Sequence, residues 1–304
     1  SLYSGVATNE DSAWKWNGAA NWNGGDLHFS EDYGYGMVNA YNAVRMAEVW
    51  SILHPQAATS ATEAMVTTGT LAVNQSIADL ATLNYSFSVA EDISLEHVAL
   101  TVSLTHSYFT DLRIRLLSPD GAAMTLYDGS TGSGSTADGT LTYTFGADGY
   151  RGLGSAGTWT LQVQDASAAD TGLLRSVAFT GYGSAASADS VYHYTDEVLS
   201  VLQLDGQSGR RVLADSDGGT DWVNAAAMAG NLVLDLDAAS TSTVGGEAFL
   251  MIADATLIEN AIGGDGDDRI EGNGAANTLY GMRGDDALYG MGGNDTLVGG
   301  DGLD

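Results

Sequence analysis

Five acidic or amide side chains recur every nine residues near the carboxyl end of the chain. They are Asp268, Asn277, Asp286, Asp295 and Asp304, the sixth residues of successive nine-residue blocks that begin at Gly263. Calcium takes about six to eight oxygen ligands from carboxylates and backbone carbonyls, so this pattern predicts a row of calcium sites. The ion would replace repulsion between neighbouring carboxylates by coordination.

The other residues of each block predict the structure that holds these side chains. Six glycine-rich residues turn the chain, and three extended residues make a short strand whose eighth-position side chain points inward. Those side chains are Ile270, Leu279, Leu288 and Leu297. Two blocks complete one coil of a parallel β-roll, so the sixth residues of odd and even blocks should line opposite edges. One apolar side chain per block is a thin core, and we expect calcium binding and folding to be a single event.

Glycine carbonyls and third-position carboxylates should complete the calcium ligands. The expected set is Gly263, Asp265, Asp268, Asn277, Gly281, Asp286, Asp295, Gly299, Asp301 and Asp304. Asn277 supplies an oxygen without a charge, so its site should be weaker. A solvated surface role is expected for Arg269 and Arg283, at the seventh and third positions of their blocks.

Composition supports a cation-binding protein. The chain has 39 acidic and 10 basic residues and a formal net charge of -29, which excludes a basic surface for nucleic acid. It has no cysteine, so no disulfide framework, and no apolar run of the roughly 20 residues that a membrane-spanning helix needs. Both ends look cut, because residues 1–8 are unlike a signal peptide and Asp304 falls within a repeat. We expect a fragment of a longer polypeptide.

Residues 78–184 predict an antiparallel sandwich of about eight strands. Apolar residues alternate with polar ones, as in Val98 to Leu104, and Ser118–Gly121 (SPDG) suits a type I turn. Three motifs in this region, DLRIRLLSPDG from Asp111, GTWTLQVQD from Gly157 and DTGLLRSVAFTGYG from Asp170, resemble the P domain of kexin-like proprotein convertases. The resemblance implies a jelly roll that stabilises a neighbouring subtilisin-like domain, with Trp159 in its core. Asp165 is expected to accept a turn or inter-strand hydrogen bond, and a calcium role for Asp111 and Asp165 stays open.

Two further segments carry resemblances. The stretch TVGGEAFLMIADATLIENAIGGDGDD, which ends at Asp268, is similar to the region that leads into the β-roll of serralysin-type metalloproteases. HFSEDYGYGMVNAYNAVRMAEVW, from His28 to Trp50, resembles the last segment of a kexin-type subtilisin catalytic domain. It predicts a helix from Ala40 to about Leu53, capped by Asn39, with Val44 and Ala47 on one face. His28 is expected to be structural.

The sequence thus predicts a mainly β chain: a jelly-roll sandwich and a parallel β-roll, with a short helical remnant of a subtilisin-like α/β domain before them. The expected divisions are a catalytic-domain remnant at 1–54, a linker at 55–77, a P domain at 78–184, a β-rich connector at 185–262 and calcium-binding repeats at 263–304. In the connector, Asp215, Asp217 and Asp221 are open between another calcium loop and ordinary turns.

The resemblances imply the calcium-binding, stabilising tail of a secreted serine endopeptidase of the subtilisin/kexin class. The sequence has neither an HExxH zinc motif nor a GTS-type serine motif, so we expect no catalytic residue in this chain and a triad upstream of Ser1. Expected partners are calcium ions, the upstream catalytic domain, its protein substrates and a bacterial type I secretion apparatus. The alternatives are a calcium-dependent adhesion module and the tail of a metalloprotease.

Overall fold

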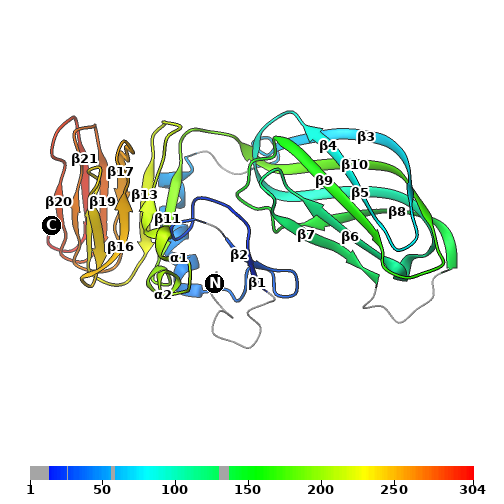
Figure 1. Ribbon diagram of the computed structural model, residues 1–304. Coiled ribbons are helices and arrows are strands. Elements are labelled where there is room, and N and C mark those ends of the chain that lie inside the picture. Colours follow the sequence, from blue (N-terminus) through cyan, green and yellow to red (C-terminus); the bar gives the residue numbers. More distant parts are fainter. Residues whose placement is uncertain (1–13, 26, 56–58, 130–136) are drawn as a thin grey trace.

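Figure 1 shows three parts of the chain in a row. The computed structural model describes residues 14–25, 27–55, 59–129 and 137–304. A sandwich of antiparallel sheets lies at one end and a stack of mostly parallel strands at the other, with the amino-terminal residues between them. The chain is therefore mainly β, as predicted. None of the helices in these ranges has the length and apolar character needed to cross a membrane.

The sandwich is built from two four-stranded sheets whose neighbouring strands are all antiparallel. One sheet has the order β3 (Ala64–Ile77), β10 (Gly172–Ala185), β5 (Ile93–Tyr108) and β8 (Ala137–Ala147). The other has the order β4 (Thr82–Val89), β9 (Gly157–Asp165), β6 (Leu112–Leu117) and β7 (Ala123–Asp128). A 3-10 turn, η2 (Phe109–Asp111), leads from the first sheet into the second.

The sandwich core forms as the alternating pattern predicts. Trp159 is fully buried, its indole ring meets Tyr150 edge-on at 5.0 Å, and its Nε1–H donates to the carbonyl of Ser155 at 2.8 Å. The expected turn is confirmed as well, because the Gly121 N–H donates to the Ser118 carbonyl at 3.0 Å. Gly121 has a φ of +90°, a conformation that favours glycine.

Strand β3 lies within residues 55–77, where the sequence predicts a linker. It pairs along its length with β10, from Ile77 opposite Gly172 to Ala64 opposite Gly183. The second part of the expected linker is therefore an edge strand of the sandwich.

The carboxyl-terminal part has two sheets that face each other across an apolar core. The first is wholly parallel and has the order β11 (Val191–Thr195), β13 (Trp222–Ala227), β17 (Asn260–Ile262), β19 (Thr278–Arg283) and β21 (Thr296–Asp301). The second has the order β12 (Val212–Leu213), β16 (Glu247–Ile252), β15 (Thr241–Val244), β14 (Leu232–Asp235), β18 (Arg269–Glu271) and β20 (Ala287–Tyr289). Two short elements, α2 (Val198–Leu202) and η4 (Ser208–Arg211), precede β12.

The nine-residue blocks alternate between these two sheets. Strand β17 pairs in parallel with β19 and β19 with β21, whereas β18 pairs with β20, so one coil takes two blocks, as predicted. The inward column is fully buried at Ile270 and Leu279, partly buried at Leu288 and 46% exposed at Leu297. Connector strands β13 and β14 pair with β17 and β18, so the connector forms the preceding layer of the same stack.

The amino-terminal residues bridge the sandwich and the roll. Strands β1 (Trp14–Trp16) and β2 (His28–Ser30) form an antiparallel pair. Next to β1, Asn17 donates through Nδ2 to the carbonyl of Gly149 in the sandwich at 3.0 Å. The buried ring of His28 lies 4.3 Å from that of Trp16, between centroids, which fits the structural role expected for it.

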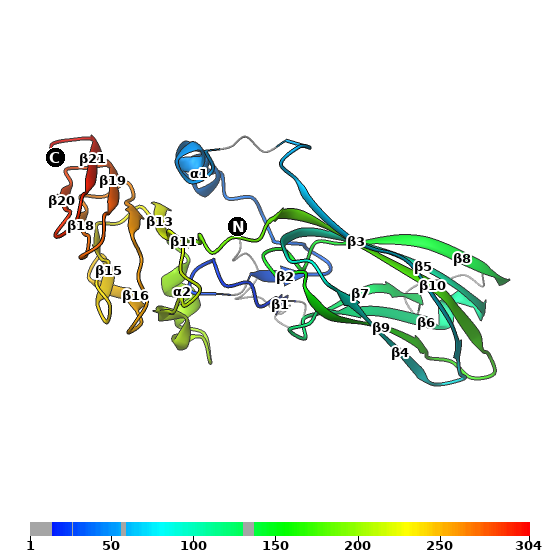
Figure 2. The same cartoon turned by 90° about the horizontal axis from the view of Figure 1, so that it is seen from above.

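Helix α1 (Ala40–Leu53) has the predicted bounds and cap, with Asn39 Oδ1 accepting from the Asn42 N–H at 3.2 Å. The side that carries Val44 and Ala47 is exposed. The helix instead buries Val49 against the parallel sheet of the roll. Figure 2 shows α1 beside the roll and apart from the strands of the sandwich.

Candidate metal centre

The sixth-position side chains of the odd blocks form one column along an edge of the roll. The N–H of Asp268 donates to Oδ1 of Asp286 at 2.9 Å, and the N–H of Asp286 donates to Oδ1 of Asp304 at 3.1 Å. Asp268 closes the column against the connector by accepting from the N–H groups of Leu232 and Gly264 at 2.8 and 2.7 Å. Each carboxylate thus links its own coil to the preceding one.

The even blocks form a second column, in which the N–H of Asn277 donates to Oδ1 of Asp295 at 3.0 Å. The Asn277 side chain accepts from the N–H of Asn273 at 2.9 Å and donates to the carbonyl of Glu259 at 2.6 Å. Asn273 was not among the predicted residues. It is buried and donates to the connector carbonyls of Leu236 and Ile258, so it caps the column. Its signal in the sequence is an asparagine at the second position of a block.

A third column, which was not among the predicted sites, lies at the fifth positions of the odd blocks. The N–H of Asp285 donates to Oδ1 of Asp267 at 2.9 Å, and the N–H of Leu303 donates to Oδ1 of Asp285 at 3.0 Å. Both carboxylates are exposed. The recurrence of aspartate at these two fifth positions could have indicated the column.

Burial makes the first column electrostatically unfavourable without a cation. Asp268 and Asp286 are 2% and 6% exposed, and Oδ2 of Asp286 has no hydrogen-bond partner. Burial raises the pKa of Asp268 to about 7, and the nearby Asp286 charge adds to the rise. Burial likewise raises the pKa of Asp286. A buried carboxylate oxygen without a donor is a position that suits a bound cation.

First-position glycines leave room beside these carboxylates. A β-carbon added at Gly281 would overlap Oδ2 of Asp286 and lie 2.5 Å from the carbonyl oxygen of Gly299 on the next coil. One added at Gly263 would lie 2.6 Å from Oδ2 of Asp268 and 2.7 Å from the carbonyl oxygen of Gly281. Each space is therefore bordered by a carboxylate oxygen and a carbonyl oxygen, the donor types that calcium prefers.

The remaining predicted ligands take different positions. Asp295 is half-buried, and Asp301 and Asp304 are exposed in the last coil. Asp265 forms an ion pair with helix α1, with 2.7 Å between its Oδ2 and Nη2 of Arg45. Among the described residues no three His, Cys, Asp or Glu side chains converge on one point, so any cation here would depend on backbone oxygens as well.

The connector carboxylates are occupied by turn and strand contacts. Asp221 is buried and accepts from the N–H of Ser190 at 2.8 Å, and burial raises its pKa to about 6. Asp215 accepts from the N–H of Asp217 at 3.1 Å and also contacts the Tyr192 hydroxyl. These contacts favour ordinary turns over a further metal loop.

In the sandwich, Asp165 is fully buried beside His106, with 3.3 Å between Oδ2 and Nε2, and its Oδ1 accepts from the N–H of Ser167 at 3.2 Å. Asp165 therefore acts as the hydrogen-bond acceptor that was expected.

Two parts of the chain match known protein families. Residues 95–180 match the proprotein convertase P-domain, and residues 262–297 and 271–304 match the RTX calcium-binding nonapeptide repeat. The P-domain match lies inside the sandwich, and the repeat matches cover the nonapeptide blocks at the carboxyl end of the roll.

Curated relatives are proteases. The chain is 32% identical over 151 residues to a calcium-dependent protease of Nostoc sp., a match that covers 48% of this chain and 21% of that protein. It is 30% identical over 165 residues to human proprotein convertase subtilisin/kexin type 7, with coverage of 52% and 20%. The chain thus spans about a fifth of the length of these relatives.

Among solved structures, the serine protease of Aeromonas sobria is similar at a TM-score of 0.43 and 20% identity, over 56% of this chain and 33% of that one. From the family matches and the curated relatives, the chain carries a proprotein convertase P domain followed by RTX calcium-binding repeats, and it is distantly homologous to calcium-dependent proteases and kexin-like convertases.

Proposed function

We propose that this chain is the calcium-folded, stabilising carboxyl-terminal region of a secreted serine endopeptidase of the subtilisin/kexin class. The order of a P domain and RTX repeats, together with the homology to calcium-dependent proteases, supports this assignment. The peptidase chemistry itself, with a Ser-His-Asp triad acting on protein substrates, would belong to a catalytic domain upstream of residue 1.

One observation supports calcium-dependent folding above all others. The buried carboxylates Asp268 and Asp286 lie in one column, and Oδ2 of Asp286 has no hydrogen-bond partner. A divalent cation between successive coils would satisfy that oxygen and offset the repulsion along the column.

The proposed ligands come from residues that the roll places on its two edges. On the odd edge they are the carboxylates of Asp268, Asp286 and Asp304 with the carbonyls of Gly263, Gly281 and Gly299, and Asp301 extends this edge. On the even edge they are Asn277 and Asp295. Calcium bound there would supply charge neutralisation and cross-links between coils that the thin apolar core does not provide.

Calcium titration followed by far-ultraviolet circular dichroism and thermal melting tests the proposal. The β-signal and the melting temperature of the 304-residue chain should both rise with calcium. Asp286→Ala should weaken the response by about tenfold or more in calcium concentration, because it removes a buried charged ligand. Asp254→Ala, which removes one charge from an exposed position in the connector, is the matched control. An unchanged response in Asp286→Ala would contradict the proposed site.

The midpoint of the same titration bears on secretion. Extracellular calcium modules bind at about 10⁻⁴ to 10⁻³ M, far above cytosolic levels, so a roll with this affinity would stay unfolded until after export through a type I secretion channel. We expect a midpoint in that range. A midpoint below about 10⁻⁶ M would mean that the roll folds inside the cell, which contradicts folding after export.

The stabilising role can be tested in the longer polypeptide. A serine-directed fluorophosphonate should label the upstream part and leave residues 1–304 unlabelled. Chelation of calcium should lower the temperature at which peptidase activity is lost, in parallel with melting of the roll. Activity that survives heating equally well with and without calcium would argue against stabilisation by this region.

A further inference from the structure

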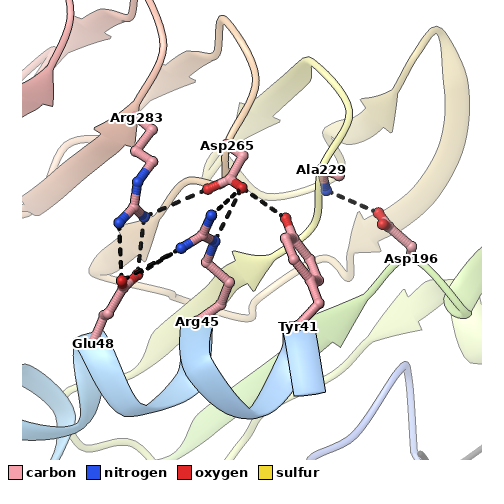
Figure 3. A network of polar contacts seen from close by, with 7 residues as sticks. All are labelled: Tyr41, Arg45, Glu48, Asp196, Ala229, Asp265 and Arg283. Carbon is pink, nitrogen blue, oxygen red and sulfur yellow. Dashed lines mark hydrogen bonds and ion pairs between the residues drawn. The ribbon is translucent and has the colours of Figure 1, made fainter. Parts of the chain in front are cut away.

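A cluster of alternating charges joins helix α1 to the first coils of the roll (Figure 3). Arg45 donates to Oδ2 of Asp265 through Nε at 3.0 Å and through Nη2 at 2.7 Å. Arg283 donates through Nη1 and Nη2 to the two oxygens of Glu48, both at 2.9 Å, and its Nη1 lies 3.5 Å from Oδ1 of Asp265. The Tyr41 hydroxyl donates to Oδ2 of Asp265 at 3.0 Å.

An apolar layer lies beneath the charges. Val49 of α1 is fully buried against Ala226 and Ile262, which come from β13 and β17. Tyr280 and Met282 of β19 pack against the same cluster. Helix α1 therefore rests on the outer face of the parallel sheet, and the charges close one side of an apolar interface.

The helix holds one oxygen of the Asp265 carboxylate. Its Oδ2 accepts one hydrogen bond from Tyr41 and two from Arg45, whereas its buried Oδ1 has no hydrogen-bond partner and lies 3.5 Å from Nη1 of Arg283. Two guanidinium groups beside it would also repel a divalent cation. These contacts oppose a role for Asp265 as a calcium ligand, although it stands at the third position of a nonapeptide block.

Part of the surface that helix α1 meets exists only when the coils are stacked. Asp265 and Arg283 occupy third positions two blocks apart, and Met282, next to Arg283, belongs to β19, which pairs with β17 of the preceding coil. If the blocks were unfolded, these residues would be joined only by flexible chain. They would then offer α1 neither the paired charges nor the part of the apolar layer that Tyr280 and Met282 supply.

We propose that the first two coils of the roll are a docking surface for α1, and that Asp265 binds Arg45 instead of calcium. Calcium-driven folding of the roll then anchors the helix that precedes the P domain, through contacts that include no calcium ligand. This inference rests on the calcium-dependent folding proposed above, and it adds the structural link by which the roll would reach the rest of the polypeptide.

Hydrogen–deuterium exchange of peptides that cover residues 40–53 tests the docking in the 304-residue chain. With millimolar calcium, exchange should be slower than with a chelator. Arg45→Met and Asp265→Asn should each speed exchange of α1 in calcium by about tenfold, because each removes the ion pair between Arg45 and Asp265. The double variant should be little worse than either single variant, since both remove the same contact.

The same samples are followed by circular dichroism, so that folding of the roll is measured separately. The calcium midpoint of Asp265→Asn should equal that of the unaltered chain. Arg269→Met is the matched control, because Arg269 contacts Glu271 and Tyr289 on the other sheet and should leave exchange of α1 unchanged.

The outcomes separate the two proposals. A higher calcium midpoint in Asp265→Asn would make Asp265 a ligand and overturn the inference, as would exchange of α1 that ignores calcium while the roll folds. If the circular dichroism signal is already complete without calcium, the proposed function fails. The Arg45→Met and Asp265→Asn variants would still decide whether Asp265 anchors α1.

Discussion

At the scale of single residues, the glycines of the roll differ in how much space surrounds the position of an added β-carbon. Gly281 lies against Oδ2 of Asp286 and the carbonyl of Gly299, whereas nothing lies within 4 Å of a β-carbon built on Gly274. We expect Gly281→Ala to lower the free energy of unfolding in saturating calcium by ~1–3 kcal/mol, because the added methyl overpacks the site. Gly274→Ala should change it by less than about 0.5 kcal/mol. Equal effects in urea unfolding would contradict the crowding at Gly281.

His193 should make stability depend on pH. Its ring lies 4.6 Å from that of Trp22, between centroids, and its Nδ1 lies 3.0 Å from Nδ2 of Asn224. Burial lowers its pKa to about 4, with a further contribution from His54. The folded state therefore favours neutral imidazole, so its contribution to stability is complete above the ordinary pKa of about 6.5 and is lost as pH falls toward about 4.

The test compares the unaltered chain with His193→Gln in urea unfolding at pH 7 and pH 5. Between pH 7 and pH 5, protonation linked to His193 should lower the free energy of unfolding of the unaltered chain by about 1–2 kcal/mol. The His193→Gln variant should lack that part of the decrease. Both proteins carry the same carboxylates, so the difference between them reports His193. Parallel pH profiles would exclude the assignment.

Residue contacts across long sequence distances were the least predictable from sequence. The sixth-position columns followed from the nine-residue phase alone. Arg283 was expected to be solvated, but it binds Glu48 of α1, and Asp265 was expected among the calcium ligands, but it contacts Arg45. The partners of both lie more than 200 residues away, and no local pattern encodes such a pairing.

At the scale of elements, the sandwich and the roll have separate apolar cores. Trp159→Ala should lower the stability of the sandwich by ~3–5 kcal/mol, because it empties a fully buried site. Tyr143→Ala, at a 56% exposed position of the same sandwich, should cost far less. The calcium midpoint of the roll should be the same in both variants when followed by circular dichroism. A shift of that midpoint in Trp159→Ala alone would mean that the two cores fold as one.

The elements were predictable where the apolar period was strong. Strands β5 and β9 and the coils of the roll match alternating or nine-residue patterns, and the Asn39 cap marked the start of α1. Strand β3 was missed, because its threonine-rich sequence leaves most side chains exposed and gives a weak alternation. Its pairing with β10, about 100 residues later, is a tertiary effect that overrides weak local propensity.

At the scale of the whole molecule, a net charge of -29 makes the identity of the cation important. Calcium accepts irregular shells of carboxylate and carbonyl oxygens, whereas magnesium demands a smaller octahedron and gives up its water reluctantly. Calcium should therefore raise the β-signal and contract the chain in small-angle X-ray scattering, and the same concentration of magnesium should do neither. An equal contraction with magnesium would show that charge screening alone is sufficient.

Helix α1 and the roll touch each other although the entire sandwich lies between them in the sequence. The contact therefore brings together the two ends of the chain segment that forms the sandwich. Mechanical tension that enters through α1 and leaves through the roll would be borne by the helix contact, and the sandwich would carry no load until that contact ruptured.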